Sequence, residues 1–391
     1  LVDRELVRVK VIRPDGPLPL AQALPILESL GLEVLSEEPA LLQDAEGRRF
    51  AIHDFGARPM VEGEIDVDAV RTVFEAAFLD VYTGRVENDR FNRLVLARGL
   101  EAREVAILRT YCKYWLQLGV PFSQSYIESV LVANAEPAER LVQLFRARHD
   151  PRLEGRAAVV ERLEAELAGA LDRVASLDED RILRAFLEMI RATTRTNWFQ
   201  RDPATGAPKG HLSIKLDPAR VPGMPRPRPA FEIFVYAPWM EGVHLRGGKV
   251  ARGGIRWSDR REDFRTEILG LMKAQMVKNA IIVPVGAKGG FVVKRPPAGG
   301  DRQALQEEGV RCYRTLLMGL LDLTDNRRGE EVVPPPDLVR YDDDDPYLVV
   351  AADKGTATFS DIANAVARDY GFWLDDAFAS GGSAGYDHKA M

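Results

Sequence analysis

The stretch ARGGIRWSDRREDFRTEILGLMKAQMVKNAIIVPVGAKGG, residues 251–290, decides which fold and which site this chain can have. It opens with the pair Gly253 and Gly254 and closes with the small-residue run GAKGG at 286–290. Glycine loses more backbone entropy on folding than any other residue, so glycine pairs beside basic residues indicate backbone that approaches a ligand. Between the two glycine clusters, the hydrophobic spacing predicts a helix over 261–280 and a strand over 281–285.

The composition is that of an ordinary water-soluble globular protein. The chain has 391 residues, 46% of them hydrophobic and 29% charged, which is enough for two or three domains. Its net charge of -6 argues against a nucleic-acid binder, and the absence of an 18-residue apolar run argues against a membrane span. Two isolated cysteines form neither a disulfide framework nor a CxxC site, so we expect a reducing, cytoplasmic location.

The sequence before this stretch predicts two preceding units. Residues 1–60 read as a small α+β module, because a strand at 6–12 and a helix at 20–30 precede strands at 32–35 and 50–55. Such a βαββ module is typical of regulatory or docking domains, although it could equally be a packing domain without a ligand. Residues 61–204 form a predicted helical linking or regulatory region, whose helical periodicity extends to Phe199.

Residues 205–391 predict an α/β domain. Strands are expected at 211–216, 231–236, 243–245, 255–257, 281–285, 291–293 and 348–352. Helices are expected at 261–280, 305–323 and 360–370, the last capped by Ser360 or Asp361. Alternation of this kind indicates helices layered on one sheet.

Two lysines stand out in this domain. Lys278 lies on one helix face with Ile268 and Leu271, where it either faces an anion in a cavity or simply complements the helix C-terminus. Lys288 follows the apolar strand and precedes a glycine pair, so we expect it on a loop at the edge of the sheet, where α/β folds place ligand sites. The alternative for Lys288 is a turn lysine with a solvated amine.

Other charged groups support an anion site. Arg252 offers a planar guanidinium suited to a carboxylate, and Asp353, at the end of the strand 348–352, is a candidate proton carrier or a simple turn residue. The acidic run 342–345 has no EF-hand spacing and predicts a solvated loop, so no metal site is expected. No GxGxxG fingerprint occurs, so the cofactor-binding residues are unknown.

Three segments in order carry a family resemblance: ARGGIR, MVKNAIIVPVGAKGG and VVAADKGTATFSDIAN. They resemble the substrate domain of glutamate dehydrogenases, and the sequence around residues 253–280 is similar to that of the large-subunit, NAD-specific bacterial enzymes. The first 60 residues resemble an ACT-like regulatory module of that family. The resemblance therefore implies an α/β substrate-binding domain preceded by a helical region and an ACT-like module.

The resemblance also implies residue roles. Lys288 matches the catalytic lysine and Asp353 the aspartate that moves protons. Lys278 matches a lysine that binds the α-carboxylate of the substrate, and Arg252 stands where small glutamate dehydrogenases have a lysine for a substrate carboxylate. The pair Gly253 and Gly254 would line the substrate pocket.

The implied reaction is oxidative deamination of L-glutamate to 2-oxoglutarate and ammonia. NAD takes the hydride from Cα, Lys288 activates water, and Asp353 moves protons as ammonia leaves. The resemblance further implies a homo-oligomer, and the expected NAD-binding domain is absent from these residues. We therefore expect the chain to be inactive alone.

Two alternatives belong to other classes. The chain could be a non-catalytic regulatory or scaffold fragment that binds a dicarboxylate or a partner subunit. It could also be a Schiff-base enzyme built on Lys288. Loss of 2-oxoglutarate binding on substitution of Lys278 or Arg252 would count against the first alternative. Failure to trap a carbonyl substrate with borohydride would exclude the second.

Overall fold

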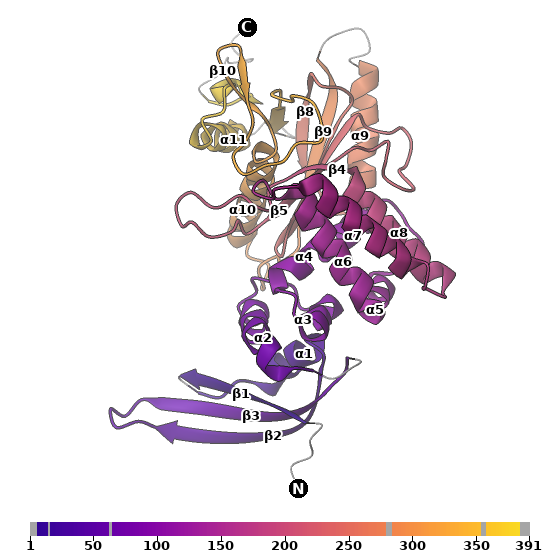
Figure 1. Cartoon of the computed structure of the whole chain (residues 1–391). Helices are drawn as coiled ribbons and strands as arrows, with labels where there is room; N and C mark the ends of the chain where they lie inside the picture. The colour runs from indigo at the N-terminus through magenta and orange to yellow at the C-terminus, as the bar shows by residue number, and fades with distance from the viewer. Residues whose placement is uncertain (1–5, 15, 62–64, 279–283, 353–356, 384–391) are drawn as a thin grey trace.

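A computed structural model describes residues 6–14, 16–61, 65–278, 284–352 and 357–383 of the chain. Figure 1 places a three-stranded sheet at the N-terminal end, a group of helices in the middle and a larger sheet at the other end. The predicted order of a small α+β module, a helical region and an α/β domain is confirmed by these elements.

The N-terminal module has the predicted βαββ order. Its elements are β1 (Val7–Pro14), α1 (Leu20–Ser29), β2 (Leu32–Gln43) and β3 (Arg49–Pro59). The strands pair antiparallel in the order β1-β3-β2, and Phe55 and Ala57 of β3 are buried with Leu27 of α1. β2 is longer than predicted, because pairing along nearly the whole of β3 overrides the low strand propensity of Glu37, Glu38 and Pro39.

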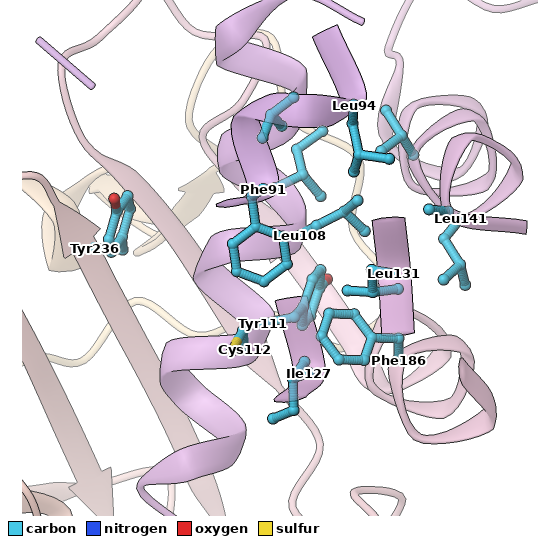
Figure 2. Packing of buried hydrophobic residues seen from close by; sticks show 14 of the residues in the cluster. Phe91, Leu94, Leu108, Tyr111, Cys112, Ile127, Leu131, Leu141, Phe186 and Tyr236 are labelled. Atoms are coloured by element: carbon cyan, nitrogen blue, oxygen red, sulfur yellow. The ribbon is translucent and has the colours of Figure 1, made fainter. Parts of the chain in front are cut away.

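The middle region is helical. Its elements are α2 (Val67–Tyr82), η1 (Arg90–Asn92), α3 (Arg93–Arg98), α4 (Ala102–Leu116), α5 (Gln124–Ala133), α6 (Ala135–His149), α7 (Arg156–Leu171) and α8 (Leu177–Ala192). Leu108 and Tyr111 of α4 pack with Ile127, Leu131 and Phe186 at its centre (Figure 2). Because the same cluster includes side chains of the large sheet, the two regions share one core.

The helical pattern ends earlier than predicted, at Ala192 rather than Phe199. Thr193–Thr196 forms strand β4, whose three threonines favour extended backbone. The Tyr111 hydroxyl lies 2.6 Å from the Thr193 hydroxyl, so α4 contacts this strand directly.

The large sheet has eight strands in the order β13-β12-β8-β9-β7-β6-β5-β4. Besides β4, they are β5 (Leu212–Leu216), β6 (Phe231–Ala237), β7 (Met240–Arg246), β8 (Ala251–Trp257), β9 (Val285–Val293), β12 (Val349–Ala352) and β13 (Ala379–Ser380). Neighbours from β4 to β9 are antiparallel, whereas β9, β8, β12 and β13 are parallel. The parallel step from β8 to β9 requires a crossover connection, which contains α9 (Phe264–Lys278).

Helices cover both faces of this sheet. On one face, Ile268 and Met272 of α9 belong to the same core as Val243 and Leu245 of β7. On the other face lie α10 (Arg302–Leu321) and α11 (Ala357–Asp369), with the small hairpin β10 (Asn326–Arg328) and β11 (Glu331–Val333) nearby. α11 contains Ser360 and Asp361 within its length, so the predicted cap at these residues is wrong; the Ser360 hydroxyl instead donates to the Ser380 carbonyl at 2.8 Å.

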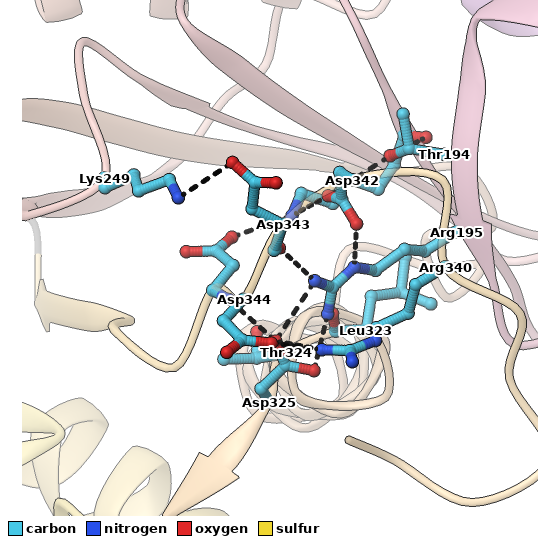
Figure 3. A network of polar contacts seen from close by, with 12 residues as sticks. Thr194, Arg195, Lys249, Leu323, Thr324, Asp325, Arg340, Asp342, Asp343 and Asp344 are labelled. Atoms are coloured by element: carbon cyan, nitrogen blue, oxygen red, sulfur yellow. Dashed lines mark hydrogen bonds and ion pairs between the residues drawn. The ribbon is translucent and has the colours of Figure 1, made fainter. Parts of the chain in front are cut away.

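The acidic run at residues 342–345 is only partly the solvated loop that was predicted, because Asp343 and Asp344 are exposed whereas Asp342 and Asp345 contact buried cations. Asp342 accepts from the fully buried Arg195 at 2.6 Å, and Arg195 also pairs with Asp325 (Figure 3). Asp345 is buried against Arg246 and Lys215. Burial alone would raise the pKa of Asp345, but these two cations hold it well below its usual range. The run therefore anchors its loop to the edge of the sheet.

Candidate functional site

Lys288 lies in the middle of β9, between β7 and β8, and not on a loop at the edge of the sheet as predicted. The glycines around it belong to the strand because neighbours occupy the space of a side chain. A Cβ added at Gly286 would lie 2.7 Å from the Met276 backbone nitrogen, and one at Gly290 would lie 2.3 Å from the Ile268 Cδ1. The GAKGG run therefore lets α9 pack closely on β9 rather than forming a turn.

The pair Gly253 and Gly254 lies on the neighbouring strand, β8. A Cβ at Gly253 would lie 1.6 Å from the Ala287 carbonyl oxygen, so Gly253 permits the close approach of β8 and β9. A Cβ at Gly254 would lie 3.2 Å from the Lys288 Nζ and 3.5 Å from the Ala351 carbonyl oxygen. The amine of Lys288 thus lies beside bare backbone at the point where three parallel strands meet.

Arg252 lies on the same strand, two residues before Gly254, and alternation along the strand places both on one face. It pairs in register with Gly286 of β9 and Val349 of β12. The side chain of Arg252 is exposed, and among the described residues its guanidinium forms no hydrogen bond or ion pair. Its guanidinium is therefore available to an anion on the face where the amine of Lys288 lies.

Lys278 is the last residue of α9 and is exposed. The last turn of α9 lies against Gly286, so the helix ends over the start of β9. The helix face that Lys278 was predicted to share with Ile268 and Leu271 is only partly buried, because Ile268 is inaccessible to solvent whereas Leu271 is 37% exposed. The structure thus brings Lys278 to the same end of the sheet as Arg252, and its amine has no hydrogen bond or ion pair with any residue that the structure describes.

Asp353 lies outside the described residues. Its sequence neighbour Ala352 ends β12, where it pairs with Ile255 of β8. Ala351 pairs with Gly254, whose position beside the Lys288 amine is described above. Of the described site residues, Arg252, Gly254 and Lys288 lie on one face of the sheet, and Lys278 lies at the same end of it.

A supporting ion pair was not predicted from the sequence. Arg256, two residues after Gly254, donates from Nε to Glu267 in the first turn of α9 at 3.0 Å. The Ser258 hydroxyl donates to the other carboxylate oxygen of Glu267. A glutamate in the first turn of a helix is a weak signal, because it also complements the helix dipole. The contact ties the end of β8 to α9 next to the site.

This arrangement can bind an anion beside an amine. A guanidinium can hold a carboxylate by paired hydrogen bonds, and a lysine amine close by can exchange protons with the bound molecule. Among the described residues, no group of three or more His, Cys, Asp and Glu side chains could hold a metal ion. In the same part of the chain, no helix is long and apolar enough to cross a membrane.

Comparison with protein families first shows which class of protein the N-terminal module and the helical region resemble. The descriptions "Glutamate dehydrogenase, ACT3 domain" and "Glutamate dehydrogenase, helical motif 3" match residues 2–70 and 86–151. Both descriptions name parts of glutamate dehydrogenases. The match to the ACT3 domain confirms the ACT-like character predicted for the N-terminal module.

The description "Bacterial NAD-glutamate dehydrogenase, catalytic domain" matches residues 166–391, which is more than half of the chain. The chain belongs to the family of bacterial NAD-glutamate dehydrogenases. The resemblance inferred from the three sequence segments is therefore confirmed.

Individual relatives agree with this family. NAD-specific glutamate dehydrogenases of Pseudomonas aeruginosa and Halomonas elongata share 56% and 53% sequence identity with this chain, in alignments that cover 98% of it. The NAD-specific glutamate dehydrogenase of Mycobacterium tuberculosis shares 52% identity, in an alignment that covers 95% of the chain. In each case the match covers 24% of the relative's length. The chain thus spans about a quarter of the length of these curated relatives.

Proposed function

We propose that this chain supplies the substrate-binding part of an enzyme that oxidatively deaminates L-glutamate to 2-oxoglutarate and ammonia with NAD. Membership of the bacterial NAD-glutamate dehydrogenase family supports the reaction. The observation that carries the proposal is the position of the Lys288 amine beside Gly254, on the face that also bears the exposed Arg252. An acidic substrate explains a cation at this place better than an apolar one does.

Each residue then has a chemical role. Arg252 binds one carboxylate of the substrate and Lys278 the other, which fixes the position of Cα. Lys288 activates the water that adds to the iminium carbon, and Asp353 carries protons as ammonia leaves. Gly254 keeps this surface free of a side chain, so the substrate can lie close to the backbone, and Gly253 supports it by letting β8 lie close to β9.

We propose that NAD binds to a part of the protein outside these 391 residues, because the sequence contains no GxGxxG fingerprint and spans about a quarter of its relatives. When bound, NAD accepts the hydride from Cα of glutamate. From the two isolated cysteines we further propose a cytoplasmic location, and from the resemblance a homo-oligomer. We also propose domain boundaries near residues 60 and 204.

The first test measures binding of 2-oxoglutarate to the purified chain by calorimetry. Charge-assisted hydrogen bonds contribute about 1.5–3 kcal/mol, so Arg252→Gln should raise the dissociation constant about tenfold or more. Arg260→Gln is a matched control, because Arg260 lies in the same segment and its guanidinium pairs with the adjacent Asp263. An unchanged dissociation constant for Arg252→Gln would refute the assigned carboxylate site.

The second test uses the intact enzyme that contains this chain. Lys288→Ala should lower kcat for glutamate oxidation by about 10²-fold or more, because general acid–base groups contribute roughly 10²–10⁴-fold. Circular dichroism and thermal unfolding would show whether the variant keeps its fold. A folded variant with normal turnover would favour the non-catalytic reading of these residues.

A further inference from the structure

We propose that a crevice between the helical region and the segment after β4 binds a small dianion, at a site separate from the candidate active site. The crevice has a volume of about 200 Å³. It is lined by Glu101, Arg103, Glu104, Arg146, Arg152, Trp198, Phe199, Gln200, Arg201 and Pro208. Neither Arg252 nor Lys288 is among these residues, so this proposal does not depend on the proposed reaction.

The charges in the crevice are unbalanced. Four arginines and two glutamates line it, an excess of two positive charges, of which Asp337 outside the crevice offsets one. Arg146 is paired with Glu104, and Arg152 lies 3.7 Å from Asp337 outside the crevice. The guanidinium groups of the other two arginines, Arg103 and Arg201, are the ones that could bind an anion.

Arg103 and Arg201 form no ion pair with any carboxylate in the described part of the chain. The one hydrogen bond of Arg201 goes to the Gly206 carbonyl, at 3.0 Å. Glu101 also lines the crevice without an ion pair, but its single charge does not neutralise both arginines. The two guanidinium groups thus face a polar space without an anionic partner in direct contact.

Arg103 is held in a fixed position. Its guanidinium stacks on the Trp198 ring, 3.7 Å from the ring centre, and also donates to the Trp198 carbonyl. Burial, together with the charges of Arg201 and Arg146 and against the opposing effect of Glu101, lowers the pKa of Arg103 to about 10. A cation that is fixed and poorly solvated gains more from a bound anion than a mobile surface arginine does.

A neighbouring cavity provides the comparison. It shares Arg103, Trp198 and Pro208 with the crevice, and its other cations are Arg85, Arg109 and Lys209. Each of these three is already paired with an aspartate: Asp80, Asp89 and Asp322, respectively. Among the described residues that line the two cavities, Arg201 therefore adds a second unpaired guanidinium to the shared Arg103 in the crevice alone.

The chemistry of the site limits the ligand. Guanidinium groups pair best with planar or tetrahedral anions that present two oxygens, such as phosphates and carboxylates. The crevice volume suits a small dianion such as inorganic phosphate or malonate, which share this chemistry. Because Arg103 comes from α4 and Arg201 from the segment that follows β4, the anion would join the helical region to the sheet domain.

The test is calorimetric titration of the purified chain with inorganic phosphate and, separately, with malonate, at constant ionic strength. Acetate is the monovalent comparison. Arg201→Gln should raise the dissociation constant of the preferred dianion at least fivefold, since it removes one charged contact from an exposed side chain without disturbing the stack of Arg103 on Trp198. Arg103→Gln should weaken binding further.

A control variant separates the site from a general loss of charge. Arg162→Gln removes one positive charge from an ion pair on the surface of α7 and should bind the dianion like the unmodified chain. Equal binding by Arg201→Gln and the unmodified chain, or equal binding of acetate and both dianions, would overturn the proposal.

Discussion

At the scale of single residues, Gly253 and Gly254 show that adjacent glycines can have different purposes. Gly253 has no room for a side chain because the Ala287 carbonyl occupies it, whereas Gly254 borders the movable end of Lys288. The sequence predicted that the backbone at both positions approaches a ligand. It could not show that the close neighbour of Gly253 is another strand, because that contact joins segments more than thirty residues apart.

Gly253→Ala should destabilise the chain strongly. The added methyl group would lie 1.6 Å from a backbone oxygen, so the two strands must separate, at a cost of about 3 kcal/mol or more. Gly270→Ala is the matched control, because nothing lies within 4 Å of its Cβ and it sits in α9. This control should stabilise by roughly 0.5–1 kcal/mol in urea unfolding. Similar stability of the two variants would contradict the packing described for Gly253.

Gly254→Ala should have a different effect. Its methyl group would lie 3.2 Å from the Lys288 Nζ, which is the end of a flexible side chain and can move. We expect a thermal midpoint close to that of the unmodified chain. In the intact enzyme, we expect kcat to fall at least tenfold, because displacement of the amine misplaces a proposed catalytic group. Normal turnover with a normal fold would show that the position of this amine is not critical.

At the scale of elements, α9 is fixed at its N-terminal end by the helical region. Gln117, just after α4, donates to the Arg261 carbonyl at 2.9 Å and accepts from the Arg265 backbone at 3.1 Å. Arg265 also forms a buried, two-point ion pair with Glu232 of β6. The periodicity of the sequence predicted this helix well, but its attachment depends on residues that are distant in sequence.

Gln117→Ala should loosen this attachment. Loss of its hydrogen bonds leaves polar backbone groups at the start of α9 without a protein partner, which should lower the free energy of unfolding by about 1–3 kcal/mol. Gln303→Ala is the control, because the side chain of Gln303 bonds only to the exposed Glu307 within α10. Hydrogen exchange should show faster exchange of the amides in the first turn of α9 for Gln117→Ala alone. Unchanged exchange there would argue against this anchoring role.

At the scale of the whole molecule, Asp322 joins distant segments. The buried carboxylate, at the end of α10, accepts from Asn197 after β4 at 2.8 Å and from Tyr370 after α11 at 2.7 Å. His211 and Lys209, just before β5, also contact it. Burial alone would raise the pKa of Asp322, but His211 and Lys209 lower it to about 2.

This carboxylate should make the protein sensitive to acid. Its pKa in the folded chain is below the ordinary value of 3.8, so its contribution is complete well above pH 3.8 and is lost as the pH falls towards 2. The difference corresponds to about 2 kcal/mol. In urea unfolding, the stability gap between the unmodified chain and Asp322→Asn should shrink between pH 5 and pH 2. Asp68→Asn, at an exposed position, should show no such trend.

Local patterns in the sequence determined the order of modules, most helices and strands, and the family, because side-chain periodicity and motif order are properties of neighbouring residues. Only the tertiary structure decided that Lys288 lies inside a strand and that Asp342 and Asp345 pair with buried arginine and lysine side chains. Strand order, helix packing and ion pairing arise between segments far apart in the chain. They therefore set the surroundings of each residue in ways that its neighbours in sequence do not reveal.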